Sequence, residues 1–420
     1  MVSTRFIVRK VVPVVFFLIS LILLTRRLPL DIRETTPDDS DNKAIEDSAP
    51  NSETLFRQDE RVGYWNKFVA DNIKYKGERD NFVFIKCMKC ATQTVAGALR
   101  RYAFTRRLNV VLPRDSNIYL GWPYLMDEVD YRPSEEKFNC LIEHAIYNRT
   151  IMEPLFPRNT PFITIIREPW NHFKSTFHYF KVDKIVGIKA QDPKEEYLKN
   201  IEKYESIYKS HESRPYRYCI PDGFSVTKNL LSHCLGMPLG FPQSRADYSQ
   251  NEVLANEYIK KLDREFGLVM IVEYFDESMI FLKRLMSWSF KEIVYKKSNV
   301  GSYAKDAYPQ YIKNIHREWS SVDYKLYDHF REKMELKIQN GGLGFQSELK
   351  QFRQILSELN RFCASARRSS RINAKISFKH FTFTGYECAF LGEEVNHLDL
   401  LQKRNNAELT EKLKSYKRTC

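Results

Sequence analysis

The sequence predicts an α/β protein whose central sheet is mostly parallel. The prediction rests on short apolar runs, on helical segments between them, and on the alternation of the two along the chain. The apolar runs, each short enough for a buried strand, are Phe82 to Ile85, Val110 to Leu112, Phe138 to Ile142, Phe162 to Ile166 and Leu268 to Val272. The helical segments lie near 92–104, 169–181, 224–236, 251–264, 275–288 and 321–337.

The composition is that of a globular protein with an excess of positive charge. Of the 420 residues 43% are hydrophobic, and the formal net charge is +13. Such a charge favours an anionic partner: nucleic acid, a membrane surface, a sulfated or phosphorylated small molecule, or an acidic glycan. The basic residues form no long block and no zinc-finger spacing occurs, so nucleic-acid binding is not expected. No His/Cys/Asp/Glu cluster indicates a required metal.

The N-terminal segment predicts a membrane anchor. An uncharged run, VVPVVFFLISLILLT, extends from Val11 to Thr25 between basic residues. It is shorter than the roughly 20 residues that span a bilayer, but flanking arginines can snorkel to the interface. A cleaved signal peptide is the alternative, and the absence of a small-x-small cleavage site favours the uncleaved anchor. We expect a short cytoplasmic tail over 1–10, an anchor over 11–27 and a translocated remainder.

The rest of the chain divides by composition. Residues 28–60 are acidic and poor in large apolar side chains, which predicts a disordered stem. A catalytic domain is expected over 61–345, and a C-terminal extension over 346–420. The extension is predicted to hold a charged helix from Ser347 to Arg368, a β-hairpin in ISFKHFTFTGYECAFLG and a polar helix. It is either a subdomain stapled by Cys363 and Cys388 or a packing appendage, and we favour the appendage.

A candidate anion site lies in NFVFIKCMKCATQTVAGALRR, residues 81–101, which reads as strand, polar loop and helix start. Lys86 and Lys89 lie in the loop, and the hydroxyls of Thr92 and Thr94 can cap the helix. The unpaired amides and positive dipole end of such a junction suit phosphate or sulfate. The alternative is an ordinary strand-to-helix turn. A nucleotide-kinase P-loop is disfavoured because G-x-x-x-x-G-K-[ST] is absent.

A second candidate anion site follows the run Phe162 to Ile166. Arg167 ends this predicted strand, and Pro169 suits the first position of the next helix. Ligands of open α/β sheets bind at the carboxyl ends of strands. Ser175, two turns into the helix, can face the same phosphate as Arg167. The alternative is that Arg167 only pairs with a carboxylate such as that of Glu168.

The cysteines and one sequon add further motifs. Cys87 and Cys90 have the spacing of a redox pair, but nothing around them is thioredoxin-like, and we interpret them as lining the anion loop. The chain has 8 cysteines, so disulfides are possible in a lumenal protein, but their pairing is open. The triplet Asn148-Arg149-Thr150 is the glycosylation sequon.

Together the two anion segments resemble the donor-binding segments of sulfotransferases that use 3′-phosphoadenosine 5′-phosphosulfate (PAPS). The loop FIKCMKCATQTV resembles that of the galactose 3-O-sulfotransferases, the family of cerebroside sulfotransferase. So do, in the same order, FNCLIEHAIYN, ITIIREPWNHFKSTFHYF, DGFSVTKNLLSHCLG and FGLVMIVEYFDESMIFLKRLMSW. The resemblance covers about 80–345. It implies a P-loop-like sulfotransferase fold, with helices flanking the sheet and a single transmembrane helix before it.

The resemblance also implies roles for individual residues. The loop would hold the 5′-phosphosulfate, and Arg167 and Ser175 the 3′-phosphate. The implied loop contacts are Lys86, Lys89, Ala91, Thr92, Gln93 and Thr94.

The implied catalytic residues are Lys89, His144 and Glu143. Lys89 would lie nearest the leaving oxygen, and His144 would act as general base, because a histidine can accept a hydroxyl proton near neutral pH. Glu143 would orient His144 or act in its place. Met88 stands where the family loop has a histidine, so any role of that histidine is absent or passes to His144.

The resemblance therefore implies an enzyme that transfers a sulfuryl group from PAPS to a sugar hydroxyl, foremost O-3 of galactose on a glycolipid or glycoprotein. Two alternatives stay open: a sulfotransferase acting on a uronic acid or hexosamine of a glycosaminoglycan, and an inactive glycan-binding relative. We expect no metal cofactor, a glycan acceptor and no nucleic acid as partners, and a Golgi membrane location with a lumenal catalytic domain. A homodimer is left open.

Overall fold

The computed structural model describes residues 77–114, 118–217, 220–296, 308–368 and 374–391, with Leu398, Leu401 and Gln402. The expected tail, anchor and stem, and most of the polar C-terminal helix, lie outside these residues and stay predictions. Among the described residues, no helix is both long enough and apolar enough to cross a membrane.

A five-stranded sheet with the order β2-β3-β1-β4-β5 forms the centre of the fold. Its strands are β1 (Phe82–Ile85), β2 (Val110–Val111), β3 (Cys140–Leu141), β4 (Phe162–Ile166) and β5 (Phe266–Ile271). Every neighbouring pair runs parallel, which confirms the predicted sheet. The chain leaves β1 for the β2 edge, returns through β3 and then crosses to β4. The strand order therefore reverses at β1, where open α/β sheets bind their ligands.

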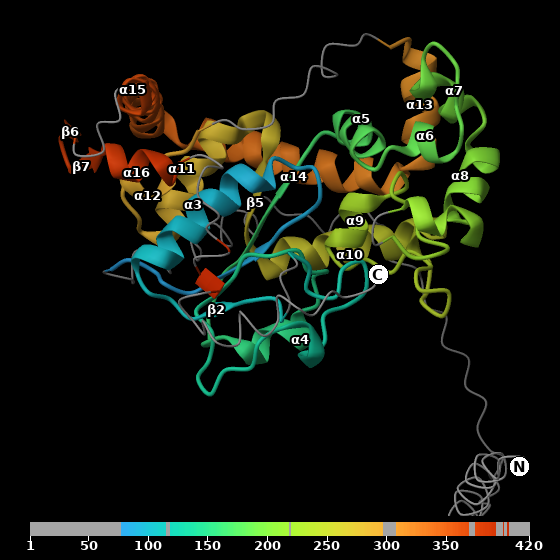
Figure 1. Ribbon diagram of the computed structural model, residues 1–420, viewed down its shortest axis with the longest axis horizontal. Helices are drawn as coiled ribbons and strands as arrows, with labels where there is room; N and C mark the ends of the chain where they lie inside the picture. Colours follow the sequence, from blue (N-terminus) through green and yellow to red (C-terminus); the bar gives the residue numbers. More distant parts are fainter. Residues whose placement is uncertain are drawn as a thin grey trace, which may run out of the picture. The chain divides into compact units, whose positions relative to one another are not determined.

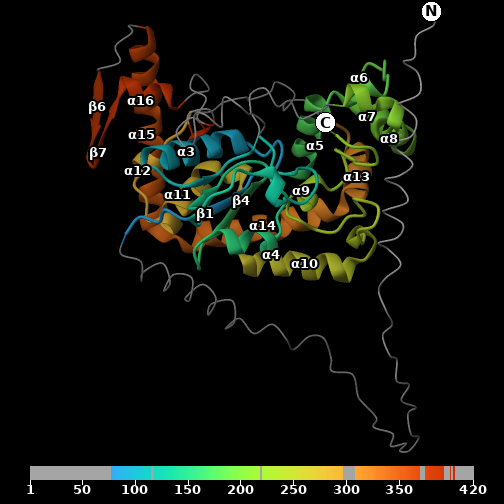
Figure 2. The same cartoon turned by 60° about the horizontal axis from the view of Figure 1, so that its bottom comes forward.

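Helices cover both faces of this sheet. The predicted ones are α3 (Thr92–Thr105), α5 (Pro169–Tyr179), α10 (Glu252–Glu265), α11 (Phe275–Met286) and α14 (Ser321–Asn340). Unpredicted ones are α4 (Arg149–Met152), α6 (Val182–Ile185), α7 (Pro193–Lys199), α8 (Ile201–Lys209), α12 (Phe290–Ile293) and α13 (Gln310–Trp319). Figure 1 shows their arrangement, and Figure 2 shows α3 and α12 on one side of β1 and β4, with α10 and α14 on the other.

One predicted helix is much shorter than expected. The segment 224–236 holds only α9 (Leu230–Cys234). Before it, the Ser225 hydroxyl accepts the amides of Thr227 and Lys228, and Asn229 has a left-handed φ of 49°. A side chain that bonds nearby backbone amides competes with helix formation, which explains the late start.

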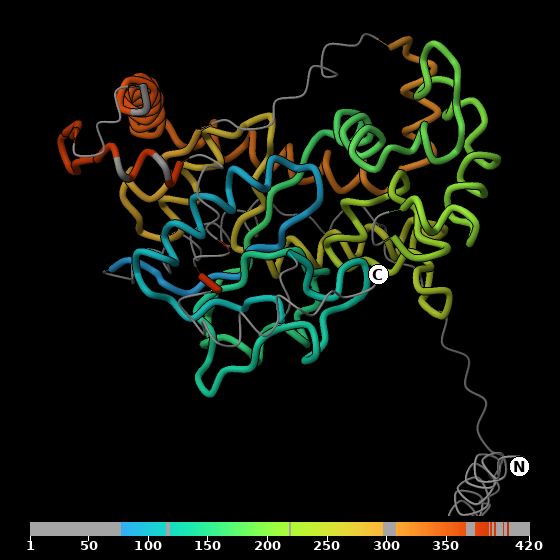
Figure 3. Tube along the Cα trace, viewed as in Figure 1, coloured from blue at the N-terminus to red at the C-terminus, as the bar shows by residue number. Residues whose placement is uncertain are grey.

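Two apolar clusters form the core. The larger surrounds the sheet and includes the fully buried Phe82 and Phe84. The second is rich in aromatic side chains and packs α5, α7, α8, α9 and α13 together. In the tube of Figure 3, α6, α7, α8 and α13 lie at one end of the described domain, and α15 (Gly342–Arg368) lies at the other.

The C-terminal extension has features of both alternatives, a subdomain held by a disulfide and an appendage packed on the main domain. The hairpin is present as β6 (Lys375–Phe378) and β7 (Phe381–Thr384), followed by α16 (Gly385–Ala389). A disulfide joins Cys363 to Cys388, and Phe345 and Phe352 of α15 belong to the core cluster around the sheet. The extension is therefore held together by a disulfide and also packs on the main domain.

The start of α15 differs from the prediction. We expected Gly341 to Gly344 to interrupt the helical pattern and the next helix to begin at Ser347. Instead α15 begins at Gly342, whose φ of 60° turns the chain sharply after α14. A Cβ at Gly341 would lie 2.6 Å from the Phe345 Cβ, so a glycine is required for this close turn.

Candidate active site

The lysine loop and Arg167 meet at one edge of the sheet. β1 and β4 are paired, with Ile85 opposite Thr164, so the loop after β1 and the residues after β4 leave at the same carboxyl edge. Arg167 Nη1 donates to the Lys89 carbonyl oxygen, 3.4 Å away. The two anion segments predicted from sequence are therefore in direct contact.

The loop reaches α3 through a left-handed turn. Lys89 and Ala91 have φ values of 59° and 52°, and Ala91 precedes the helix without a side-chain cap. We expected threonine hydroxyls to cap α3, but the Thr92 hydroxyl instead donates to the Cys87 carbonyl, 3.1 Å away. The Thr94 amide donates to the Ala91 carbonyl at 3.1 Å, and a helix start without a side-chain cap offers its other first-turn amides to an acceptor such as an anion. His172 bonds the Met88 carbonyl through Nε2 at 2.8 Å and so holds the loop from α5.

A disulfide anchors the same loop. Cys87 pairs with Cys234 of α9, which lies 147 residues away in the chain. This pairing excludes a Cys87–Cys90 redox pair, and the Cys90 thiol donates to the Met88 carbonyl instead. The start of α9 is held in turn by Asp323 of α14, which accepts the Leu231 and Ser232 amides.

Lys86 and Glu143 form a buried ion pair with a third residue, Arg100. Arg100 Nε and Nη2 donate to the two Glu143 oxygens at 2.7 and 2.5 Å, and Lys86 Nζ lies 3.4 Å from Oε2. Burial alone would raise the pKa of Glu143, but Arg100 and Lys86 outweigh it and lower that pKa to about 2. Burial lowers the pKa of Lys86 to about 8. Of the two loop lysines, only Lys89 lies outside the cluster of Lys86, Glu143 and Arg100.

Arg100 was not among the residues predicted for this site. Its only signal is an arginine on the apolar face of α3, beside Val95, Ala96 and Leu99, where it is 6% exposed. A charged side chain on a buried helix face is almost always paired, which marks it as a structural ion-pair residue.

His144, the predicted base, is held in place by the backbone. Its Nδ1 lies 2.7 Å from the Lys86 carbonyl oxygen. A carbonyl only accepts, so Nδ1 carries the hydrogen, and Nε2 of the neutral ring keeps its lone pair. Burial, reinforced by Lys86, holds the pKa of His144 well below its ordinary value. The Lys86 carbonyl thus orients this ring, and the role expected of Glu143 stays a prediction.

Aromatic side chains connect the two predicted catalytic residues. The Lys89 ammonium lies 4.2 Å from the centre of the Tyr179 ring, which is 45% exposed. A continuous series of ring contacts then leads back to His144: Tyr179–Phe180 at 5.0 Å, Phe180–Trp122 at 6.4 Å, Trp122–Tyr119 at 5.4 Å and Tyr119–His144 at 5.6 Å. This series was not predicted, although the segments FHYF and IYLGWPYL contain its rings.

Arg167 carries an unused donor. Its Nε is buried and has no hydrogen-bond acceptor among the described residues. The alternative pairing with Glu168 is not what the structure shows, because the Glu168 carboxylate caps α5 by accepting the Trp170 and Asn171 amides. A buried N–H without an acceptor is costly, so an anionic ligand oxygen fits this position. Ser175 is 2% exposed on the same helix.

The remaining predicted residues lie on the start of α3. Ala91 and Gln93 are exposed, Thr94 is half-buried and Thr92 is buried. Within the described part of the chain, no group of three or more His, Cys, Asp or Glu side chains is arranged to hold a metal ion.

The sequence model for galactose-3-O-sulfotransferase matches residues 58–384. Human galactosylceramide sulfotransferase is 30% identical over 271 residues, which cover 63% of this chain and 59% of that protein. Human galactose-3-O-sulfotransferase 2 is 26% identical over 294 residues, covering 67% of this chain and 68% of that protein. Bovine galactose-3-O-sulfotransferase 3 is 27% identical over 284 residues, covering 67% and 63%. The match thus spans about three fifths of the first of these relatives.

Proposed function

This chain belongs to the galactose-3-O-sulfotransferase family, and on that premise we propose that it transfers a sulfuryl group from PAPS to a sugar hydroxyl, foremost O-3 of galactose on a glycolipid or glycoprotein. One observation carries the proposal. The carboxyl ends of β1, β3 and β4 bring the lysine loop, His144 and Arg167 to a single edge of the sheet.

The donor side of this edge fits a nucleotide with anionic groups at both ends. The start of α3 has no side-chain cap, and Lys89 adds a positive charge beside it. Arg167 supplies a buried N–H for which the described part of the chain offers no acceptor. These groups would hold PAPS, which supplies the sulfuryl group when bound.

In the proposed reaction His144 accepts a proton and Lys89 stabilises the leaving group. His144 Nε2 accepts the proton of the acceptor hydroxyl as that oxygen bonds to sulfur, and the Lys86 carbonyl keeps the ring in the required tautomer. The Lys89 ammonium stabilises the charge that grows on the leaving phosphate oxygen. Glu143 is a poor base beside His144, because its low pKa and its contacts with Arg100 and Lys86 hold it ionised.

The aromatic series suits a sugar acceptor. One face of a hexose presents C–H groups, which pack against aromatic rings, and small-molecule sites are commonly lined this way. Tyr179 and Phe180 are the members of the series that reach solvent. We place the galactose beside them, between Lys89 and His144.

Incubation of the protein with labelled PAPS and a panel of acceptors tests this function. The panel holds galactosylceramide, a galactose-terminated glycoprotein glycan, and glycosaminoglycan fragments with uronic acid and hexosamine. We expect transfer to galactose, and we expect linkage analysis of the product to find the sulfate at O-3. In His144→Ala and Lys89→Ala, turnover should fall at least about a hundredfold, while His211→Ala, whose side chain is 76% exposed, should keep it.

The outcomes separate the alternatives. Full turnover by a folded His144→Ala protein would refute the assigned base, and labelling of only the glycosaminoglycan fragments would replace the acceptor. Calorimetry with adenosine 3′,5′-bisphosphate, the desulfated donor product, tests the donor site itself. Absence of binding would favour an inactive glycan-binding protein.

We also propose a Golgi membrane location, with the N-terminal run as anchor and the catalytic domain in the lumen. Two disulfides, Cys87–Cys234 and Cys363–Cys388, support an oxidising compartment. Protection of the domain from added protease in intact vesicles is the expected result, and digestion without detergent would contradict it.

A further inference from the structure

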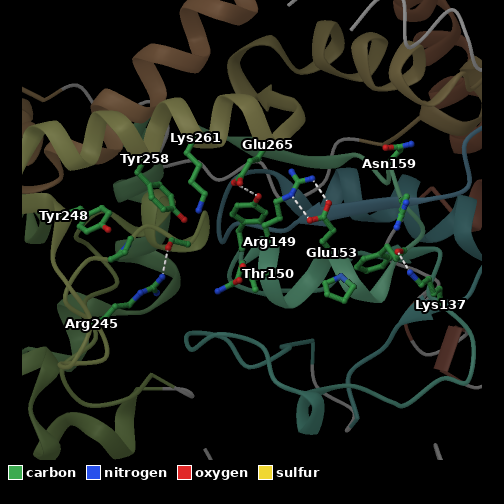
Figure 4. A pocket seen from close by; sticks show the side chains of 17 residues that line it. Lys137, Arg149, Thr150, Glu153, Asn159, Arg245, Tyr248, Tyr258, Lys261 and Glu265 are labelled. Carbon is green, nitrogen blue, oxygen red and sulfur yellow. Dashed lines mark hydrogen bonds and ion pairs between the residues drawn. The ribbon is translucent and has the colours of Figure 1, made fainter. Parts of the chain in front are cut away.

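A polar groove lies at the edge of the sheet opposite the candidate active site. Its lining includes Lys137 before β3, Arg158 before β4 and Glu265 directly before β5. Because these strands are parallel, their amino ends share one edge, and the carboxyl ends that carry Lys89 and Arg167 share the other. The groove is open and has a volume of about 920 Å³. Figure 4 shows its lining side chains.

Positive charge outnumbers negative charge along this groove. The basic lining residues are Lys137, Arg149, Arg158, Arg245 and Lys261, and the acidic ones are Glu153 and Glu265. Arg149 donates to Glu153 at 2.7 Å, and the Tyr147 hydroxyl donates to Glu265 at 2.8 Å. Figure 4 shows Glu153 near the middle of the groove, and Glu265 beside Lys261, where the middle meets the end formed by Arg245, Tyr248, Tyr258 and Lys261. We call that end the tyrosine end.

The tyrosine end holds a cation in a fixed position. Arg245 is half-buried, and its Nη2 donates to the Gly236 carbonyl oxygen at 2.6 Å. Gly236 has a φ of +81°, and a Cβ there would lie 2.0 Å from the Tyr147 carbonyl oxygen, so only glycine fits this close approach. Burial lowers the pKa of Arg245, and this loss of hydration outweighs the opposing influence of Tyr258 and Tyr248.

Two aromatic rings and a second cation complete this end. The Lys261 ammonium lies 5.2 Å from the centre of the Tyr258 ring. The Tyr248 and Tyr258 rings meet edge to face, with centres 6.2 Å apart. A ring surface beside a guanidinium and an ammonium offers packing and charge to the same ligand.

We propose that the tyrosine end binds an acidic sugar, a hexose that carries a sulfate or carboxylate group. Arg245 and Lys261 would bind the anionic group, and Tyr258 or Tyr248 would pack against the sugar ring. The site is separate from the transfer reaction, since it lies at the other edge of the sheet. It gives the protein a second contact with glycans that already carry negative charge.

A glycan attached to Asn148, one of the lining residues, would compete for the same groove. Asn148 belongs to the sequon, and its Oδ1 accepts the Ile151 amide at 3.2 Å where α4 begins. A neutral glycan attached there would cover the groove. Binding is therefore measured on the full chain both before and after treatment with N-glycosidase.

Calorimetry with defined disaccharides tests the proposal. The probes are a galactose-3-sulfate disaccharide, a glucuronic-acid disaccharide and a neutral galactose disaccharide, each with adenosine 3′,5′-bisphosphate present to fill the donor site. We expect the acidic probes to bind more tightly than the neutral one, and more weakly as salt rises. A preference for the sulfated or for the carboxylated probe identifies the natural substituent.

Substitutions then locate the binding. Arg245→Ala and Lys261→Ala should each weaken acidic-probe binding by about tenfold, since charge-assisted contacts to an anion are lost. Lys260→Ala is the matched control, because this neighbour on α10 does not line the groove. Lys261→Ala should keep sulfuryl transfer. Unchanged binding in an Arg245→Ala/Lys261→Ala protein of normal melting temperature, or equal affinity for neutral and acidic probes, would overturn the proposal.

Discussion

At the scale of single residues, the chemistry of His144 depends on one carbonyl oxygen. The Lys86 carbonyl fixes the hydrogen on Nδ1, and thereby leaves Nε2 as the basic atom. Lys86 thus acts on this histidine twice, through its backbone and through an ammonium that helps to lower the histidine pKa.

The pH dependence of turnover follows from that pKa. A protonated His144 has no lone pair on Nε2, so kcat/KM should fall as the pH drops through the pKa of the free enzyme. Because burial lowers this pKa, the acid limb should lie below the ordinary histidine value of about 6.5. A kcat/KM profile measured against pH checks this, and a limb at or above 6.5 would contradict it.

The buried Glu143 gives a stability prediction at the same scale. Arg100→Ala leaves this carboxylate without its bidentate partner, which should cost about 3–5 kcal/mol of unfolding free energy at neutral pH. Arg149→Ala is the control, since the side chains of its pair with Glu153 are 36% and 56% exposed and the loss should be no more than about 1 kcal/mol. Urea unfolding measures both, and equal losses would contradict the prediction.

The same carboxylate links stability to pH. Its pKa of about 2 in the folded protein lies below its ordinary value of 4.5. Its stabilising contribution is therefore complete above pH 4.5 and is lost as the pH falls from there toward 2. In Arg100→Ala this loss should shrink, because the folded and ordinary pKa values draw together.

At the scale of elements, a disulfide does for the lysine loop what glycines do in phosphate-binding loops. The loop between β1 and α3 has no glycine, although Lys89 and Ala91 adopt left-handed φ values. Cys87–Cys234 ties it to α9, and Asp323 ties α9 to α14. The loop geometry thus depends on elements that follow it by more than a hundred residues.

Breaking that disulfide should therefore affect donor binding, whereas breaking the other should not. We expect Cys87→Ser/Cys234→Ser to weaken adenosine 3′,5′-bisphosphate binding by about tenfold, and Cys363→Ser/Cys388→Ser to leave it unchanged. By the chain-entropy relation the two losses of stability are about 5 and about 3.5 kcal/mol. Calorimetry on the variants that remain folded compares their affinities for adenosine 3′,5′-bisphosphate. Equal affinity in both would contradict the loop-anchoring role.

At the scale of the whole described domain, the parallel sheet assigns different chemistry to its two edges. The carboxyl edge gathers the lysine loop, His144 and Arg167, and the amino edge carries the basic groove. A parallel sheet keeps these sites apart because each strand delivers one end to each edge. Substitutions at Lys261 and at Lys89 should thus act independently.

Local patterns in the sequence predicted much of this fold. The runs 82–85 and 162–166 became β1 and β4 with the expected bounds, since an unbroken apolar run flanked by polar residues fits a strand buried on both faces. The helix at 224–236 failed because the Ser225 hydroxyl competes for nearby amides. That competition is local, but the helical apolar pattern concealed it.

The sequence by itself determined the strand, loop and helix around Lys86 and Lys89, the arginine that ends the neighbouring strand, and the family resemblance, because these depend on residues close together in the chain. Only the tertiary structure decided that Lys86 faces Glu143 and Arg100, that Cys87 bonds Cys234, and that aromatic rings connect Lys89 to His144. Each of these contacts joins segments distant in sequence. Their partners are chosen by how the helices pack on the sheet, and no local periodicity records that choice.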